Sequence, residues 1–377
     1  MKNVFFYGPL AHVPLLEIVL GCRLEGRRFK AASLADYTAF HTNGQSYPVL
    51  VPQIGCAVDG LVLAELTPQE QARVEFHQGS NIYRLHNVTS GSESDVRQVN
   101  VFAPKPEGPQ TVKWDYSGWQ AQWAEITILA AIEAMGYFGQ LTTGELALRY
   151  GSIWRRADSF HRGQSESGRA ASHSREDVQV VDIRTPYSNF YAVQEYDLRH
   201  RKFNGDFSEQ MERGVFVAFD AAIVLPYDPV LDCVLLIEQF RIGAYARGAK
   251  QPWLLEAVAG LVDVGETPEQ CAMRETVEEA GVHLDRLIPI SQAFPSPGNS
   301  TEQFYIYLGL CDLSGKGDTV SGVQSEDEDI RSHVLSFDAF MDFINASAGG
   351  AGGANVLPLI TAAYWLAINR EQLMQDA

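Results

Sequence analysis

Residues 260–282, GLVDVGETPEQCAMRETVEEAGV, decide the fold of the C-terminal half of this chain. Fixed residue types recur in this stretch at the spacing G-x5-E-x7-R-E-x2-E-E-x-G, and chance agreement at one start site is on the order of one in 10⁸. The seven positions are Gly260, Glu266, Arg274, Glu275, Glu278, Glu279 and Gly281. We refer to residues 260–282 as the box.

Local signals within the box predict one helix with defined ends. Thr267 is an N-cap residue, Pro268 suits the first helical position, and Gln270 completes a capping box. Gly281 suits the left-handed position just after a helix. The helix should therefore run from residue 268 to about residue 280.

Three carboxylates share one face of this predicted helix. Glu279 lies four residues after Glu275, and Glu278 lies three residues after it, so their charges repel each other. Arg274 is the one cation placed on the helix to compensate, which leaves a charge that a divalent cation would neutralise. Oxygen ligands suit Mg²⁺, with Mn²⁺ as an alternative, rather than zinc. The alternative interpretation is an acidic surface helix with solvated glutamates.

Bulk composition sets outer limits on the class of protein. A chain of 377 residues that is 46% hydrophobic is long enough for two packed domains. A net charge of −18 argues against a nucleic-acid partner or an anionic membrane surface. No apolar run approaches the roughly 18 residues of a membrane span, and the five scattered cysteines resemble reduced thiols. We therefore expect a cytoplasmic protein without membrane contact.

Hydrophobic periodicity divides the chain into three parts. Residues 1–110 alternate short apolar runs with turns, which indicates a small β-rich domain. Residues 111–177 change to helical phasing and then to a polar linker, which indicates a helical connector. Residues 178–377 mix strands with helices, so we expect an α+β fold in which this domain is a sandwich with a mixed sheet.

The box resembles that of the Nudix hydrolase family. In that family, an α/β/α sandwich holds cations on the box helix against the diphosphate of a nucleoside derivative, and water attacks phosphorus. Flanking segments are similar to the ADP-ribose pyrophosphatase branch, which releases AMP and ribose 5-phosphate. These segments are LRHRKFNG (198–205), LPYDP (225–229), LLIEQFRIGAYARG (235–248), PWLLEAVAG (252–260) and SPG (296–298).

The resemblance also implies a role for each matching residue. The implied metal ligands are the carbonyl of Ala259 and the carboxylates of Glu275, Glu278, Glu279 and Glu328. The implied substrate-binding residues are Phe190, Arg213, Arg241, Glu256 and Gly298. Phe190 would stack on adenine, and the two arginines would pair with the diphosphate or the terminal ribose. The alternatives are a core aromatic side chain and surface ion pairs.

The general base in this branch is a glutamate on a loop beyond the box. Alignment of SPG and of EDIRSHV implies Glu326, with Glu275 and Glu279 completing the catalytic set. The alternative is that the run EDED at 326–329 is merely solvated. In this branch, a sheet exchanged between subunits carries the equivalents of Phe190 and Arg213, so the resemblance implies a homodimer.

The N-terminal domain resembles the γ-glutamylcyclotransferase-like (AIG2-like) family through FFYGPL (5–10) and VEFHQGSNIYRL (74–85). The implied pocket residues are Tyr7, Gly8, Pro9, Leu10 and Gln78. The family has an acid at the position of Gln78, and an amide cannot exchange a proton in that way. We therefore expect a fold kept for binding, regulation or assembly.

Three functions stay open on the sequence. The first is hydrolysis of ADP-ribose, the second is a non-catalytic nucleotide sensor, and the third is catalysis on γ-glutamyl compounds by the N-terminal domain. The combination of the two domains resembles a small group of bacterial proteins linked to tellurite resistance. The intact glutamate set favours the first function, and Gln78 weighs against the third.

Overall fold

The chain forms two compact units, residues Met1–Ser167 and Gly168–Ala377. The structure, a computed structural model, describes residues 3–24, 29–41, 47–79, 83–90, 97–104, 112–165, 172–317, 319–322, 329–346 and 352–376. Within these ranges, no helix is both long and apolar enough to cross a membrane. The predicted α+β class is confirmed, because both units combine helices with mixed sheets.

The first unit is built on a five-stranded sheet in the order β2-β3-β1-β5-β4. Its strands are β1 (Val4–Phe6), β2 (Phe29–His41), β3 (Pro48–Leu63), β4 (Tyr83–Ser90) and β5 (Arg97–Pro104). Its helices are η1 (Gly8–Ala11), α1 (Val13–Leu20), α2 (Pro68–Gln78), α3 (Tyr116–Gly136) and α4 (Thr143–Ser165). Strand β1 pairs parallel with β5 and antiparallel with β3, so the sheet is mixed.

Helix α3 belongs to the core of the first unit. Its residues Trp119, Ala124 and Ala131 are buried in one apolar cluster with Leu16 of α1 and Phe102 of β5. The sequence predicts these helical residues as a connector, because helical periodicity shows which face is apolar but not what covers it. The boundaries 1–110, 111–177 and 178–377 stay a prediction.

The second unit is built on an eight-stranded sheet in the order β13-β14-β9-β10-β16-β15, with β11 paired to β10 and β12 paired to β9. Its strands are β9 (Ala221–Asp228), β10 (Cys233–Phe240), β11 (Trp253–Glu256), β12 (Val258–Leu261), β13 (Arg286–Ala293), β14 (Phe304–Leu310), β15 (Val320–Ser321) and β16 (Ile330–Ser336). Its helices are η2 (Arg175–Asp177), α5 (Ile242–Ala246), α6 (Pro268–Ala280), α7 (Phe337–Ala346) and α8 (Leu357–Gln375).

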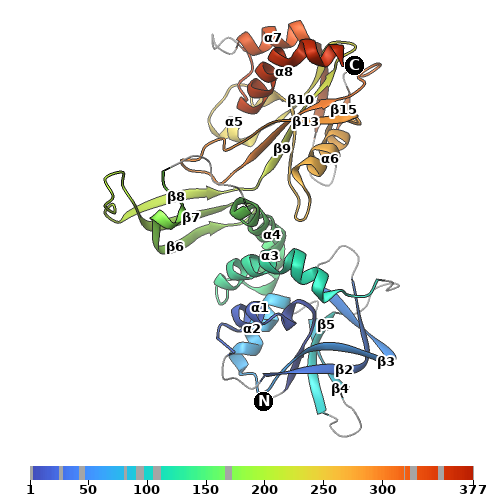
Figure 1. The fold of residues 1–377 in the computed structure, drawn as a ribbon, viewed down its shortest axis with the longest axis vertical. Coiled ribbons are helices and arrows are strands. Elements are labelled where there is room, and N and C mark those ends of the chain that lie inside the picture. Colours follow the sequence, from blue (N-terminus) through green and yellow to red (C-terminus); the bar gives the residue numbers. More distant parts are fainter. Residues whose placement is uncertain are drawn as a thin grey trace. The chain divides into compact units, whose positions relative to one another are not determined.

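Helices cover both faces of this larger sheet (Figure 1). Successive side chains of a strand point to opposite faces, so β10 serves two cores. Leu236 packs in the cluster that contains Phe340 of α7 and Leu366 of α8. Leu235 packs in the cluster that contains Cys271 of α6. The second unit is therefore a three-layered sandwich with the box helix on one side.

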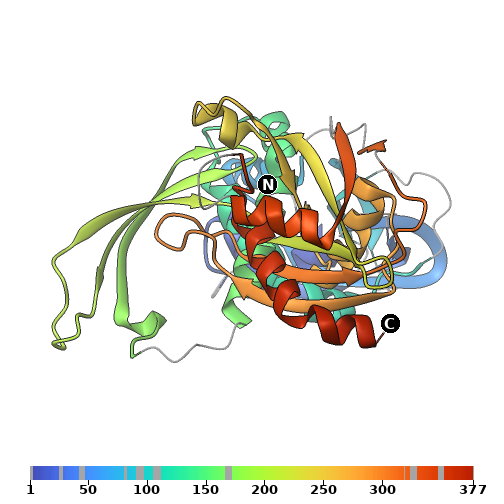
Figure 2. The same cartoon turned by 90° about the horizontal axis from the view of Figure 1, so that it is seen from above.

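A separate three-stranded sheet precedes this sandwich in the chain. It consists of β6 (Val178–Ser188), β7 (Ala192–His200) and β8 (Met211–Val217), all antiparallel. Figures 1 and 2 both show this sheet extending away from the larger sheet of its unit. Val180, Val181 and Ile183 of β6 are exposed, so in a single chain this sheet leaves apolar side chains in contact with water.

Candidate functional site

Helix α6 of the box has the ends that the sequence predicts. The hydroxyl of Thr267 accepts a hydrogen bond from the backbone N–H of Gln270, and the Gln270 side chain accepts one from the N–H of Thr267. Gly281 ends the helix with a φ of 61°. These ends are local properties of the chain, and the predicted range of 268–280 is confirmed.

Gly260 lets the helix approach strand β12 closely. A Cβ atom at Gly260 would lie 1.9 Å from both Cδ and Oε1 of Glu275. No side chain larger than hydrogen therefore fits at residue 260 while the carboxylate of Glu275 keeps its place. The first glycine of the box sets the position of one proposed metal ligand.

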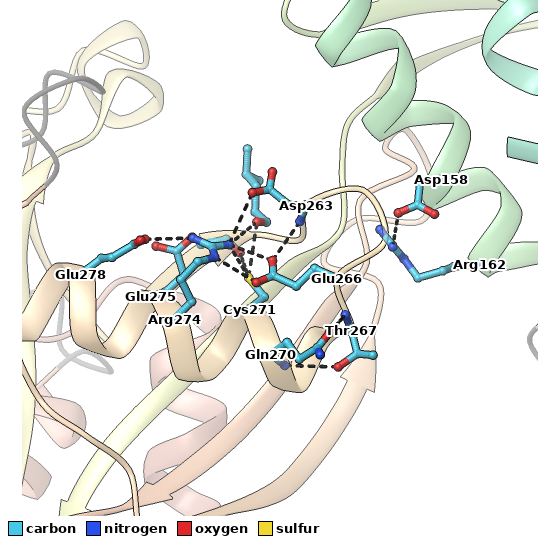
Figure 3. Close-up of polar contacts among 12 residues, drawn as sticks. Asp158, Arg162, Asp263, Glu266, Thr267, Gln270, Cys271, Arg274, Glu275 and Glu278 are labelled. Carbon is cyan, nitrogen blue, oxygen red and sulfur yellow. Dashed lines mark hydrogen bonds and ion pairs between the residues drawn. The ribbon is translucent and has the colours of Figure 1, made fainter. Parts of the chain in front are cut away.

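One guanidinium group organises the carboxylates of the box (Figure 3). Arg274 donates to both carboxylate oxygens of Glu266, each at 2.9 Å. It also donates to Glu275 at 2.6 Å and to Glu278 at 3.0 Å. The sequence predicts that the charge of Arg274 offsets that of Glu278, because both lie on the helix. The contact between Arg274 and Glu266 depends on how the loop folds back onto the helix.

The electrostatics of the box follow from this arrangement. Hydrogen bonds from Arg274 to Glu266 and the charge of Glu275 raise the pKa of Arg274 above its ordinary value. Burial acts to raise the pKa of Glu266, but hydrogen bonds from Arg274 and from the N–H of Asp263 outweigh burial and lower it. Arg274 therefore holds the carboxylate of Glu266 in its charged form.

Glu279 is the most deeply buried carboxylate of the box, with 2% of its surface exposed. Its Oε2 accepts a hydrogen bond from the backbone N–H of Ala259 at 3.0 Å. Helix α6 and strand β12 therefore bring together two of the residues to which the resemblance assigns metal binding. At the end of the helix, the hydroxyl of Ser321 donates to the carbonyl of Glu279, and Lys316 donates to the carbonyl of Gly281 at 2.7 Å.

Arg241 and Glu256 form an ion pair beside this core. The Nε and Nη2 atoms of Arg241 lie 2.8 Å and 2.7 Å from one oxygen of Glu256, which is 6% exposed. Strand pairing explains the contact, because Arg241 directly follows β10 and Glu256 ends β11, which pairs with β10. The guanidinium of Arg241 stays partly exposed and can still bind an anion.

Phe190 lies in an aromatic cluster within its own chain. Its ring lies 4.8 Å from that of Tyr191 and 5.2 Å from that of the buried Phe219, and its side chain is half exposed. Burial raises the pKa of Tyr191, the charge of Glu302 raises it further, and that of Arg241 lowers it. The cluster therefore lies within electrostatic range of Arg241.

The loop that carries Gly298 borders the same cluster. Phe216 of β8 donates its N–H to the carbonyl of Asn299, and its carbonyl accepts from the N–H of Thr301. The rings of Phe216 and Tyr191 lie 4.8 Å apart. Phe190, Gly298 and Arg241 thus approach one end of the sandwich, although they are distant in sequence.

Arg213 lies away from this group in a single chain. Arg213 of β8 lies opposite Tyr196 of β7. Val217 lies opposite Ala192 next to the aromatic cluster, four residues further along β8. At about 3.4 Å per residue, the separation is about 14 Å. Its guanidinium donates to the carbonyl of Glu212 at 2.8 Å.

Glu302 and Tyr191 are candidate site residues that sequence reasoning missed. Burial raises the pKa of Glu302, which lies between Gly298 and the start of β14. Their signal in the sequence is weak, because each is a single residue beside a motif and only the fold brings them close to Arg241. Glu326 and Glu328 lie outside the residues that the structure describes.

The donor chemistry of the box fits a hard cation. All of its candidate side-chain ligands are carboxylates, and oxygen donors suit divalent cations that retain waters. In the described part of the chain, no group of three or more His, Cys, Asp or Glu side chains converges on one point as a complete metal site. Arg274 contacts one oxygen of Glu275, and a carboxylate has a second oxygen that can bind a cation.

The pocket residues implied for the first unit form a compact turn. The hydroxyl of the buried Tyr7 donates to the carbonyl of Pro48 at 3.1 Å. Gly8 has a φ of 57°, and a Cβ there would lie 2.6 Å from Pro48. Pro9 and the buried Leu10 continue this turn as η1. Gln78 ends α2, and its amide nitrogen lies 3.2 Å from Nδ1 of His77.

Comparison with known proteins assigns both units. Residues 218–358 match the family model of the NUDIX domain, and residues 4–121 match that of gamma-glutamyl cyclotransferase, AIG2-like. The ADP-ribose pyrophosphatase of Escherichia coli (strain K12) is 36% identical over 200 residues, which are 53% of this chain and 92% of the relative. That of Haemophilus influenzae is 32% identical over 205 residues, 54% of this chain and 92% of the relative.

A third relative has a different name. The GDP-mannose pyrophosphatase of Pectobacterium atrosepticum is 31% identical over 168 residues, 45% of this chain and 85% of the relative. Both predicted resemblances are confirmed. Nudix hydrolases generally depend on divalent metals and hydrolyse nucleoside diphosphate derivatives. This chain belongs to the Nudix hydrolase family and carries an AIG2-like domain in its N-terminal unit.

Proposed function

We propose that this protein hydrolyses the diphosphate of ADP-ribose to AMP and ribose 5-phosphate, with Mg²⁺ as the cation and Mn²⁺ as a substitute. The observation that carries this proposal is the match to relatives named ADP-ribose pyrophosphatase. That match spans 200 residues at 36% identity, against 168 residues at 31% for a relative named GDP-mannose pyrophosphatase. The likeness therefore extends beyond the box to the segments that would bind substrate.

The arrangement around Arg241 supports binding of a nucleoside diphosphate. Its guanidinium is partly exposed and anchored by Glu256, and a planar guanidinium matches the geometry of phosphate oxygens. The half-exposed ring of Phe190 is available for stacking on a base. A substrate with a base at Phe190 and its diphosphate near Arg241 would present the reacting phosphorus to the carboxylates of α6.

The chemical step uses water as the nucleophile. Bound cations would neutralise the diphosphate and lower the pKa of the attacking water. Ala259, Glu275, Glu278, Glu279 and Glu328 are the residues that we propose to hold them. Glu326 takes a proton as the water oxygen bonds to phosphorus, and the bridging P–O bond breaks to release the two monophosphates.

The described residues on either side of the Glu326 segment support the proposed role of Glu326. Ser321 pairs with Ile330, and the Ser321 hydroxyl contacts the carbonyl of Glu279. Glu326 follows Ser321 by five residues and precedes Ile330 by four. The described chain just before the Glu326 segment thus contacts the end of the box helix, which supports the proposed role of Glu326.

We further propose a homodimer in which β6–β8 serves the second subunit. Two observations support it: β6 exposes Val180, Val181 and Ile183, and Arg213 is far from the remaining substrate residues of its own chain. A three-stranded sheet with exposed apolar side chains is stabilised when a partner covers it. A second copy would cover this sheet and deliver Arg213 to a site.

For the N-terminal unit, we propose binding or assembly without cyclotransferase activity. Gln78 occupies the position of the family's acid, and its neighbour Glu75 accepts a hydrogen bond from Gln71 at 2.8 Å. The hydroxyl of Tyr7 is likewise bonded to Pro48. Cytoplasmic location and a link to tellurite resistance stay predictions.

A substrate panel tests these proposals. The purified protein is incubated with Mg²⁺ and, separately, ADP-ribose, GDP-mannose, NADH and γ-glutamyl peptides, and initial rates give kcat/KM for each. We expect ADP-ribose to give the highest value and the peptides to remain intact. A higher value for GDP-mannose would overturn the substrate, and cleavage of no diphosphate would overturn the reaction.

A further inference from the structure

Two buried polar side chains of the second unit, Gln239 and Ser332, each have a polar atom without a hydrogen-bond partner among the described residues. Gln239 is 8% exposed and Ser332 is 1% exposed. The Gln239 amide nitrogen and the Ser332 hydroxyl have no hydrogen-bond partner in the described part of the chain. Buried polar groups in folded proteins almost always have a partner, which can be water or a ligand.

Strand register places both side chains on the face of the sheet that α6 covers. Ser332 of β16 lies directly opposite Ile237 of β10, and Gln239 lies two residues after Ile237. Ile237 and Ile330 pack in the same cluster as Cys271 and Ala280 of the box helix. Since side chains alternate along a strand, Gln239 and Ser332 share the layer between the sheet and α6.

The same layer contains two of the proposed site carboxylates. Glu256 lies opposite Ile237 on the other side of β10, so Glu256, Ile237 and Ser332 form one row across three strands. Glu279 is connected to this region through Ser321, which contacts the Glu279 carbonyl and pairs with Ile330. Gln239 and Ser332 therefore lie on the sheet face that the box helix covers, and Ser332 lies in the same row as Glu256.

Partners for the two carboxylates come from the protein, whereas the Gln239 amide nitrogen and the Ser332 hydroxyl have none among the described residues. Glu256 is paired with Arg241, and Glu279 accepts from Ala259. Mg²⁺ keeps several waters when carboxylates bind it, and residues that hydrogen-bond to those waters orient the metal's coordination shell. A metal-bound water can donate a hydrogen bond to the Ser332 hydroxyl and can weakly accept one from the Gln239 amide N–H. Both groups can therefore hydrogen-bond to such a water.

We propose that Gln239 and Ser332 are positioning residues that hydrogen-bond to water in the coordination shell of the cation held by the α6 carboxylates. The inference rests on the proposed function, because it requires a cation on the box helix. It goes beyond the carboxylate set by assigning a metal-orienting role to two neutral residues of β10 and β16.

Cation binding without nucleotide tests this role. Mn²⁺ is titrated with the full-length protein, and electron paramagnetic resonance of the free ion gives Kd. The variants are Ser332→Ala and Gln239→Met, which remove the polar atoms and keep nearly the length of each side chain. We expect each variant to bind Mn²⁺ about 10-fold more weakly, the lower end of the effect of removing an outer-shell partner.

Two buried residues provide matched controls. Thr38 is 6% exposed with an unpartnered hydroxyl in the described part of the first unit, and Gln303 is 3% exposed with an unpartnered amide beside β14. Thr38→Val and Gln303→Met should leave the Kd for Mn²⁺ unchanged. A loss of affinity in these controls equal to that in the variants would overturn the specific role.

Thermal unfolding separates this role from a purely structural one. In EDTA, we expect Tm of Ser332→Ala and Gln239→Met to equal or exceed that of the wild type, because each removes an unpartnered buried group. Added Mn²⁺ should raise Tm less in the variants than in the wild type. If the wild type hydrolyses nucleotides but both variants bind Mn²⁺ with the same Kd as the wild type, this inference alone is overturned. If the wild type binds no Mn²⁺, the proposed function is overturned as well.

Discussion

Arg274 fixes the charged residues of the box. Its guanidinium donates to Glu266, Glu275 and Glu278, and its side chain is 31% exposed. One cation thus offsets the mutual repulsion of carboxylates that would otherwise destabilise adjacent helical turns. The contact between Arg274 and Glu275 holds that carboxylate beside Gly260.

Gly260→Ala should lower catalysis strongly with a small effect on folding. The added Cβ would overlap Glu275, so the carboxylate must move. Misplacement of a catalytic group by about 1 Å costs about 100-fold in rate. The measurement is kcat for ADP-ribose, with Gly243→Ala as the control because a Cβ there meets nothing within 4 Å. Equal kcat values for the two variants would contradict this role of Gly260.

Glu326→Gln should lower kcat and leave KM nearly unchanged. The amide keeps the size of the side chain but cannot accept the proton of the attacking water. Loss of a general base typically costs about 10² to 10⁴ in rate. Steady-state kinetics with ADP-ribose measure both constants, and an unchanged kcat would remove Glu326 from the mechanism.

At the scale of elements, helix α8 is attached to the turn between β9 and β10. Arg370 of α8 donates to both oxygens of Asp232, and its guanidinium lies 4.2 Å above the ring of Phe337. Asp232 has a φ of 51°, a conformation that Asp and Asn adopt more readily than most residues. The turn therefore holds the carboxylate of Asp232 where Arg370 of α8 can pair with it.

Asp232→Asn should destabilise the protein at neutral pH and not in strong acid. Hydrogen bonds from Arg370 lower the pKa of Asp232, against a smaller opposing effect of burial. A lowered pKa contributes stability above the unfolded-state value of about 3.9, and this stability is lost as pH falls through the folded-state value. We expect a loss of about 1 kcal/mol at pH 7, the upper end for a partly exposed pair.

Urea unfolding of both proteins at several pH values measures this difference. Asparagine can adopt the same backbone conformation and can still accept from the Tyr227 hydroxyl, which lies 2.9 Å from Asp232. The substitution therefore isolates the charge. A difference between the two proteins that stays constant down to pH 2 would show that the ion pair with Arg370 is not its cause.

Local elements could be predicted from the sequence, and long-range contacts could not. The ends of α6 follow from Thr267, Pro268 and Gly281, which act within a few residues. The bond between Arg274 and Glu266 depends on a loop, and the approach of Glu302 to Tyr191 depends on how β14 lies beside β9. Helical periodicity likewise identified α3 without identifying the core that buries it.

At the scale of the whole molecule, the proposed site is incomplete in one chain. Arg213 lies about 14 Å along β8 from Val217, which is next to the aromatic cluster, at the spacing of strand residues. The exposed apolar residues of β6 belong to the same sheet. Exchange of this sheet between two copies would explain both observations with one interface.

Subunit complementation tests this exchange. Arg213→Ala and Glu279→Gln are each expected to be nearly inactive alone. If Arg213 acts in the partner's site, co-expression gives heterodimers with one intact site, and random pairing restores about a quarter of the wild-type activity. Glu275→Gln with Glu279→Gln is the control, because both residues lie on one helix and no intact site can form. Recovery in neither pair would contradict the exchanged sheet.

The central claim is that the protein hydrolyses a nucleoside diphosphate derivative with a divalent cation that the carboxylates of the box bind. The most direct measurement follows ADP-ribose by ³¹P NMR in the presence of Mg²⁺, with wild type beside Glu279→Gln. We predict that the wild type replaces the two diphosphate resonances with those of AMP and ribose 5-phosphate, and that EDTA or Glu279→Gln preserves the diphosphate. Persistence of the diphosphate with the wild type, or equal hydrolysis by Glu279→Gln, would contradict the claim.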